Sequence, residues 1–103
     1  MEKEVSRAIR SRLESAYGDR LRGIVLYGSE SRGDAGPDSD IDLLVLLQGP
    51  IHLWQDLRTC VHALYPLTLA LGRPLTPKPV DVLRYGSDQV TLFQNARRQE
   101  IPL

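Results

Sequence analysis

The sequence predicts a small α/β or α+β sandwich made by a single domain over residues 1–103. Two short apolar runs, at residues 21–27 and 40–48, have the length and the Val and Ile content of strands. Two longer segments, at residues 3–17 and 51–65, carry apolar side chains at helical spacing. Helices therefore alternate with strands in a chain long enough to bury one modest core.

The N-terminal part of the chain is expected to form a helix and a strand that lead into a loop. Val, Ala, Ile and Leu recur at helical spacing over residues 3–17, which indicates an amphipathic helix. The run LRGIVLY at residues 21–27 reads as a strand ended by Gly28. Residues 29–39 are rich in Gly, Ser and Asp and are expected to form a loop, with room for one helical turn at 29–32.

The second strand and the second long helix follow directly. The segment DIDLLVLLQ at residues 40–48 contains a continuous apolar run, which is typical of a central strand covered on both faces. Leucine and valine at helical spacing predict a helix over residues 51–65. Pro66 is expected to end or kink this helix, and the following LTLALG segment could add a further turn or two.

The C-terminal part is predicted to hold one more strand and one more helix. The proline-rich segment RPLTPKP at residues 73–79 is expected to be a connection. The segment VDVLRY at residues 80–85 alternates weakly and is predicted to be the third strand. Ser87 is a plausible N-cap for a final helix over residues 88–98.

Composition and charge exclude several classes of protein. Thirteen basic residues balance thirteen acidic ones, which argues against a general nucleic-acid binder but leaves a local nucleotide site open. No apolar run approaches the roughly 20 residues of a membrane span, and the start MEKEVSRAIR lacks the apolar segment of a secretory signal. Cys60 is the only cysteine, so no disulfide framework or cysteine metal site is expected. These features predict a cytoplasmic protein without direct membrane or nucleic-acid contacts.

Two aspartates separated by one residue, Asp40 and Asp42, stand at the start of the most hydrophobic segment. In a strand their side chains lie on the same face, about 7 Å apart, while Ile41 points into the core. Like charges so placed repel, and a divalent cation would relieve that repulsion. Magnesium takes one or two carboxylates together with substrate phosphates, so the pair predicts a magnesium site. A solvated turn after Pro37 is the competing interpretation.

Two further features would complete a nucleoside triphosphate pocket. Gly28 and Ser29 end the first strand, where free backbone N–H groups and the serine hydroxyl can bind a phosphate. If the third strand neighbours the second, Asp81 at its start could face the acidic pair, share the metal and accept a proton. Taken alone, an isolated aspartate is more often a surface residue than a catalytic one.

The combination G-S-x(10)-D-x-D resembles the signature of the nucleotidyltransferase superfamily that includes DNA polymerase β. Its wider context, LYGSESRGDAGPDSDIDLLVLL, is similar to the minimal nucleotidyltransferase (MNT) family in particular. The resemblance extends over nearly the whole chain. It implies a polymerase-β-type fold, with a small mixed sheet of about three or four strands flanked by helices.

The resemblance also implies roles for individual residues. It assigns nucleotide binding to Gly28, Ser29 and Arg32. It assigns metal binding and catalysis to Asp40, Asp42 and Asp81. The implied cofactor is Mg²⁺ and the implied substrate is ATP. One position departs from the family pattern, because Glu30 stands where a basic residue commonly follows Gly-Ser. An acid beside a phosphate site is unfavourable if it points inward.

Members of the MNT family pair with HEPN-domain ribonuclease toxins and can neutralise them by transferring AMP to a toxin tyrosine. The resemblance therefore implies a magnesium-dependent adenylyltransferase that acts as an antitoxin. Two alternatives stay open: a catalytically degenerate protein that neutralises its toxin by binding alone, and nucleotidyl transfer to a small molecule. Glu30 favours the binding-only alternative, and the sequence leaves a homo-oligomer open.

Overall fold

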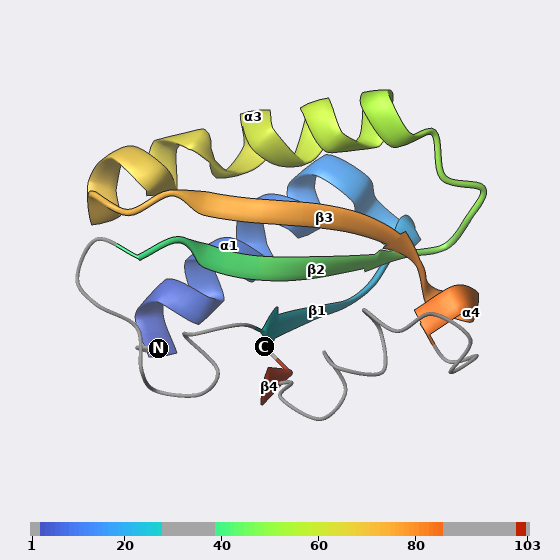
Figure 1. Ribbon diagram of the computed structural model, residues 1–103, viewed down its shortest axis with the longest axis horizontal. Coiled ribbons are helices and arrows are strands. Elements are labelled where there is room, and N and C mark those ends of the chain that lie inside the picture. The colour runs from blue at the N-terminus through green and yellow to red at the C-terminus, as the bar shows by residue number, and fades with distance from the viewer. Residues whose placement is uncertain (1–2, 28–38, 86–100, 103) are drawn as a thin grey trace.

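The computed structural model describes residues 3–27, 39–85 and 101–102 (Figure 1). Within these ranges the chain forms four α- or 3₁₀-helical segments and four strands. In chain order they are α1 (Lys3–Tyr17), the 3₁₀-helix η1 (Gly18–Arg20), β1 (Leu21–Tyr27), β2 (Ile41–Leu47), α3 (Leu53–Leu71), β3 (Leu75–Asp81), α4 (Val82–Tyr85) and β4 (Ile101–Pro102). The predicted first helix and first two strands are confirmed, the second strand being one residue shorter at each end than predicted.

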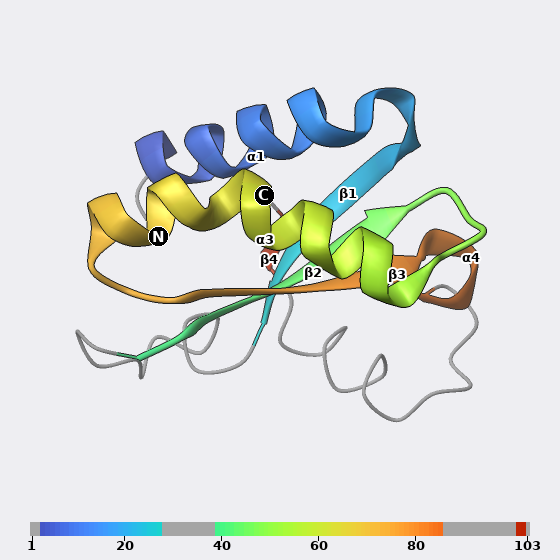
Figure 2. The same ribbon diagram turned by 90° about the horizontal axis from the view of Figure 1, so that it is seen from above.

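The strands form one mixed sheet in the order β3-β2-β1-β4. Strand β1 runs antiparallel to both β2 and β4, whereas β2 and β3 are parallel. Helices α1 and α3 lie side by side on the same face of this sheet (Figure 2). The parallel β2–β3 pair is connected through α3, as the crossover of a parallel pair requires. The predicted α+β sandwich is therefore confirmed.

Strand β2 is central and buries apolar side chains on both faces. Alternate β2 residues join the cluster under α1 and α3, which comprises Ile9, Leu13, Tyr17, Ile24, Leu26, Ile41, Leu43, Val45, Leu47, Cys60, Leu64 and Leu75. The intervening β2 residues join a smaller cluster on the opposite face, with Val25, Leu44, Leu46 and Val80. The continuous apolar run predicted this double burial, because each face of a strand takes every second side chain.

Helix α3 continues through Pro66 to Leu71, where the sequence predicted an end or a kink. Pro66 lies on the exposed side of the helix, so water can bond the carbonyl that its missing N–H leaves without a helical donor. The end of α3 is set instead by Gly72, whose φ of 68° is left-handed and whose N–H donates to the Thr68 carbonyl at 3.0 Å. Such a glycine is a common helix C-terminus.

The predicted third strand over residues 80–85 is wrong in position. Strand β3 begins earlier, at Leu75, and takes in most of the segment expected to be a connection, while Val82–Tyr85 turns into α4. The prolines are tolerated because β3 is an edge strand. The Leu75 N–H bonds Thr68 Oγ1 at 3.3 Å and so points away from β2. Pro77 and Pro79 lie two and four residues on, so their missing N–H groups fall on the same unpaired edge.

The remaining predicted elements lie outside the described residues. These are the loop and helical turn at residues 29–38 and the final helix at residues 88–98. No helix in the described part of the chain combines the length and the apolarity that crossing a membrane requires.

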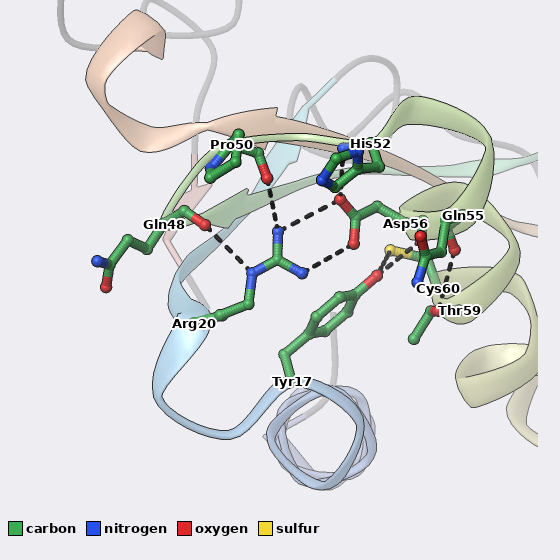
Figure 3. Close-up of polar contacts among 9 residues, drawn as sticks. All are labelled: Tyr17, Arg20, Gln48, Pro50, His52, Gln55, Asp56, Thr59 and Cys60. Atoms are coloured by element: carbon green, nitrogen blue, oxygen red, sulfur yellow. Dashed lines mark hydrogen bonds and ion pairs between the residues drawn. The ribbon is translucent and has the colours of Figure 1, made fainter.

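The guanidinium of Arg20 ties η1 to the connection between β2 and α3 (Figure 3). It donates to the carbonyls of Gln48 and Pro50, both at 3.2 Å. It also forms a two-pronged ion pair with Asp56, with N···O distances of 3.0 and 3.3 Å. The second Asp56 oxygen accepts the backbone N–H of His52 at 3.0 Å, so it also holds the start of α3. Only 3% of Asp56 is exposed, which makes this contact the polar anchor of the helix layer.

Tyr17 and Cys60 complete the polar cluster beneath α3. The Tyr17 hydroxyl lies 2.6 Å from the Asp56 carbonyl, to which it donates, and 3.1 Å from Cys60 Sγ. Burial raises the pKa of the Tyr17 hydroxyl, and it raises the pKa of the Cys60 thiol to about 11. Both groups are therefore neutral near pH 7, and Cys60 lacks the thiolate character of a reactive cysteine.

Acid is expected to weaken this anchor. Burial alone would raise the pKa of the Asp56 carboxyl, but the hydrogen bonds from Arg20 and from the His52 N–H outweigh burial and hold that pKa below its ordinary value. A carboxyl with a lowered folded pKa stabilises the fold above its unfolded pKa of about 3.9, and this stabilisation is lost as the pH falls from there through the folded pKa. Urea unfolding measured between pH 7 and pH 3 should show that loss, and the free energy of unfolding of Asp56→Asn should fall less over this pH range. An equal fall in the natural protein and in Asp56→Asn would contradict the role of Asp56 in acid sensitivity.

Candidate active site

The predicted acidic pair lies at the N-terminal end of β2, where Asp42 belongs to the strand and Asp40 directly precedes it. Ile41, between the two aspartates, is buried in the core beneath the helices. Strand alternation therefore directs Asp42 to the other face, on the same side as Leu44. Asp40 precedes the strand and is exposed, whereas Asp42 is partly buried.

The electrostatics of this corner favour a positive ligand. Burial, and then the charge of Asp40, raise the pKa of the Asp42 carboxyl. Tyr27 pairs with Asp42 across the β1–β2 ladder, and its own pKa is raised by burial and then by the Asp42 charge. Two adjacent carboxylates with this mutual repulsion suit a divalent cation that also binds phosphates. Asp40 and Asp42 thus have the chemistry to hold Mg²⁺.

Asp81 does not join this pair, so the prediction of three converging carboxylates is wrong. Strand β3 is parallel to β2, and in their register Thr76 pairs with Asp42 whereas Asp81 pairs with Leu47. Asp81 is therefore five residues further along the ladder, a separation of about 16 Å at the rise of a parallel strand. The error follows from the misplaced strand: a third strand that began at residue 80 would have put Asp81 beside the pair.

Asp81 instead has a structural role at the far end of the sheet. Its Oδ1 accepts the Leu83 N–H at 2.9 Å and so caps the first turn of α4. Its carboxylate also packs against the backbone of Gly49, where any Cβ would overlap Asp81 Oδ2. A side chain at residue 49 would therefore require the Asp81 carboxylate to move, and Asp81 contributes to the junction between β3 and α4.

Two residues that the sequence interpretation passed over lie beside the acidic pair. Thr76 is exposed and occupies the β3 position opposite Asp42. Arg73 donates from Nε to the Ser39 carbonyl at 3.0 Å, which anchors the chain just before Asp40. The available signal was the alternation of apolar and polar residues in LTPKPV, which follows a strand period although two of its apolar members are prolines.

The other predicted site residues lie outside the described part of the chain: Gly28, Ser29 and Arg32, together with Glu30. Their assignment to the nucleotide stays a prediction. Among residues 3–27, 39–85 and 101–102, no three His, Cys, Asp or Glu side chains come together as a metal-binding group. The described carboxylates of the site are therefore the pair Asp40 and Asp42.

Comparison with known proteins gives one family match and one short sequence relative. The family model described as a nucleotidyltransferase domain matches residues 6–85. A protein of Methanocaldococcus jannaschii, named as a candidate protein adenylyltransferase, MJ0604, is 47% identical over 34 residues. That stretch is 33% of this chain and 34% of the relative, so the match spans about a third of the curated relative's length.

A solved structure extends the likeness to the fold. The crystal structure of a toxin–antitoxin with AMP-PNP contains a chain that superposes with a TM-score of 0.66 at 23% sequence identity. The superposition covers 93% of this chain and 69% of that chain. At this level of identity the match concerns the arrangement of helices and strands. The predicted nucleotidyltransferase-type fold is confirmed by it.

Proposed function

Because the chain belongs to the nucleotidyltransferase-domain family, we propose that it catalyses magnesium-dependent transfer of AMP from ATP to a tyrosine hydroxyl of a partner HEPN ribonuclease toxin. In this role it is a cytoplasmic antitoxin that inactivates its partner by covalent modification. Gly28, Ser29 and Arg32 hold the triphosphate, and Asp40 and Asp42 hold the metal.

The acidic pair is the observation that carries this proposal. Burial and repulsion by Asp40 both disfavour the ionised form of the Asp42 carboxyl. A cation bound between the acidic pair and a nucleotide would reduce both penalties. A bound Mg²⁺ would supply charge stabilisation for the phosphate oxygens. The side chain of Asp42 stands on a central strand whose neighbours are buried, so its position is rigid. Rigid placement matters because phosphoryl transfer depends mainly on positioning and electrostatics.

The reaction exchanges one phosphorus–oxygen bond for another. The tyrosine oxygen bonds to the α-phosphorus of ATP, and the bond between that phosphorus and the bridging oxygen to the β-phosphorus breaks. Pyrophosphate leaves with the bonding electron pair, and the phenolic proton passes to solvent. Since an ordinary tyrosine has a pKa of about 10, loss of this proton is the step for which a nearby base is most useful.

The named relatives support a protein acceptor. The archaeal relative is named for protein adenylylation, and the similar fold comes from a toxin–antitoxin bound to an ATP analogue.

Transfer of label from ATP tests the proposal. The protein is incubated with α-labelled ATP, Mg²⁺ and the purified product of the adjacent gene, and the partner is then analysed for covalent label. We expect label on a partner tyrosine, and none when Mg²⁺ is chelated. If the two proteins form a stable complex but no label reaches the partner under any condition, AMP transfer is rejected and neutralisation by binding alone remains.

A specific observation favours binding without transfer as a second candidate. The β3 position opposite Asp42 is occupied by Thr76, whose hydroxyl is a far weaker metal ligand and base than a carboxylate. Two carboxylates suffice to hold a metal–nucleotide complex, but no third carboxylate among the described residues joins them to accept the acceptor's proton. In this second role the chain neutralises its toxin by contact.

Thr76→Asp is expected to separate these two functions. The new carboxylate would lie across the ladder from Asp42, with Cβ atoms about 5 Å apart, and would add both a metal ligand and a proton acceptor. We expect tighter Mg²⁺ binding by calorimetry, faster label transfer, and lower thermal stability in the absence of metal because of added repulsion. Thr76→Asn, which adds similar bulk without charge, is the control. Equal Mg²⁺ affinity in the two variants would contradict the placement of Thr76 beside the metal site.

A further inference from the structure

Helix α3 carries an exposed apolar stripe along its outer side. Trp54, Val61, Tyr65 and Leu69 are separated by seven, four and four residues, which places them on one helical face. Their exposed fractions are 76%, 44%, 57% and 66%. An amphipathic helix normally leaves a polar face to solvent. A line of large exposed apolar side chains is instead typical of an interaction surface.

Arg58 is the one charged residue of α3 on this side, and it is exposed between Trp54 and Val61. The only acidic residue of α3 is Asp56, which is buried and paired with Arg20. The stripe therefore contains a cation and no carboxylate from its own helix.

We propose that this face of α3 is the docking surface for a partner-protein helix that carries an apolar stripe flanked by Asp and Glu. Apolar contact along Trp54, Tyr65 and Leu69 would supply the burial, and acidic side chains of the partner would pair with Arg58. A second copy of this chain fits less well. A second copy would offer no carboxylate from its own α3 to pair with Arg58, so that charge would lose water without gaining a partner.

The docking surface is separate from the nucleotide site. Helix α3 covers the sheet face that buries Leu43 and Val45, whereas Asp42 projects from the opposite face. A partner on α3 therefore leaves the acidic pair open, and docking does not require nucleotide. This separation makes the proposal independent of whether AMP transfer takes place.

Trp54 provides a direct probe, because it is the only tryptophan of the chain and lies within the stripe. The full-length protein is titrated with a synthetic amphipathic helix whose leucines follow the same spacing and whose flanking positions are Glu. A second peptide has Lys in place of every Glu. We expect the acidic peptide to shift Trp54 emission to shorter wavelength, with an affinity that falls as salt rises, and the basic peptide to cause no shift.

Matched variants then locate the contact. Leu69→Ser and Arg58→Glu should each weaken binding of the acidic peptide about tenfold, as expected for central contacts. Leu83→Ser, which changes an even more exposed leucine outside α3, and Arg7→Glu, which changes an exposed arginine on α1, should leave it unchanged. Asp42→Asn should also bind normally, whatever its effect on transfer. Folding of each variant is checked by circular dichroism.

Three results would overturn the proposal. The first is an absence of any Trp54 shift with the acidic peptide. The second is equal binding of the acidic and basic peptides, which would mean that charge plays no part. The third is concentration-dependent self-association in sedimentation velocity that is abolished by Leu69→Ser, which would identify a second copy as the occupant.

Discussion

Asp42→Asn is expected to lower nucleotidyl transfer by on the order of 10²–10³-fold, whereas Asp81→Asn is expected to leave it within about twofold. The amide removes the negative charge that holds the cation at the partly buried position of the pair, and Asp40 alone is exposed and weakly placed. Asp81 lies at the opposite end of the β2–β3 ladder, and asparagine there can still cap α4. Initial rates of label transfer at saturating ATP provide the measurement.

A second readout makes this comparison independent of the acceptor protein. Without metal, Asp42→Asn should melt slightly higher than the natural protein, because it removes a carboxylate whose pKa is raised by burial and by Asp40. Added Mg²⁺ with ATP should raise the melting temperature of the natural protein and of Asp81→Asn but not that of Asp42→Asn. If Asp81→Asn instead lost transfer as completely as Asp42→Asn, the register of β3 against β2 would be wrong.

Arg20→Ala is expected to destabilise the fold by about 2–3 kcal/mol, which is at or below the low end for a broken buried ion pair because part of Arg20 is exposed to solvent. The change leaves the buried Asp56 carboxylate without its charged partner and removes the donors to the Gln48 and Pro50 carbonyls. Equilibrium unfolding in urea at pH 7 measures the loss, with an unchanged slope showing that only stability has changed.

An exposed ion pair on α1 supplies the control for this experiment. Arg10 and Glu14 are separated by 3.7 Å, and both side chains are largely open to solvent. Arg10→Ala should therefore change the free energy of unfolding by no more than about 0.5 kcal/mol. Equal effects of Arg10→Ala and Arg20→Ala would show that burial of Asp56 does not govern the strength of its pairing.

The site shows where local pattern suffices and where it fails. The face of Asp42 could be predicted because the alternation of side chains along a strand is a local property, and Asp40 immediately precedes that strand. The convergence of Asp81 could not be inferred, because it depends on where β3 begins and on its register against β2. Pro77 and Pro79 hid the start of β3, since proline usually marks the absence of a strand.

Helix α3 is a second element for which the local sequence pattern gave a wrong prediction. The spacing of its apolar residues predicted a helix, but local rules placed a break at Pro66, while the structure continues to Gly72. Tertiary contacts decide the matter: Leu64 is buried before the proline and Leu67 packs against the same core after it. The burial gained on both sides offsets the backbone hydrogen bond that is lost at an exposed position.

By itself the sequence determined the fold class, the two central strands, the first helix and the acidic pair with its nucleotidyltransferase signature. Each of these depends on residue types at short, regular spacing, which act through local backbone geometry. The tertiary structure alone decided that Thr76 rather than Asp81 faces Asp42, that Arg20 is held by Asp56, and that the apolar stripe of α3 is exposed. Those outcomes depend on strand register and helix packing, which are set by the burial of side chains far apart in the chain.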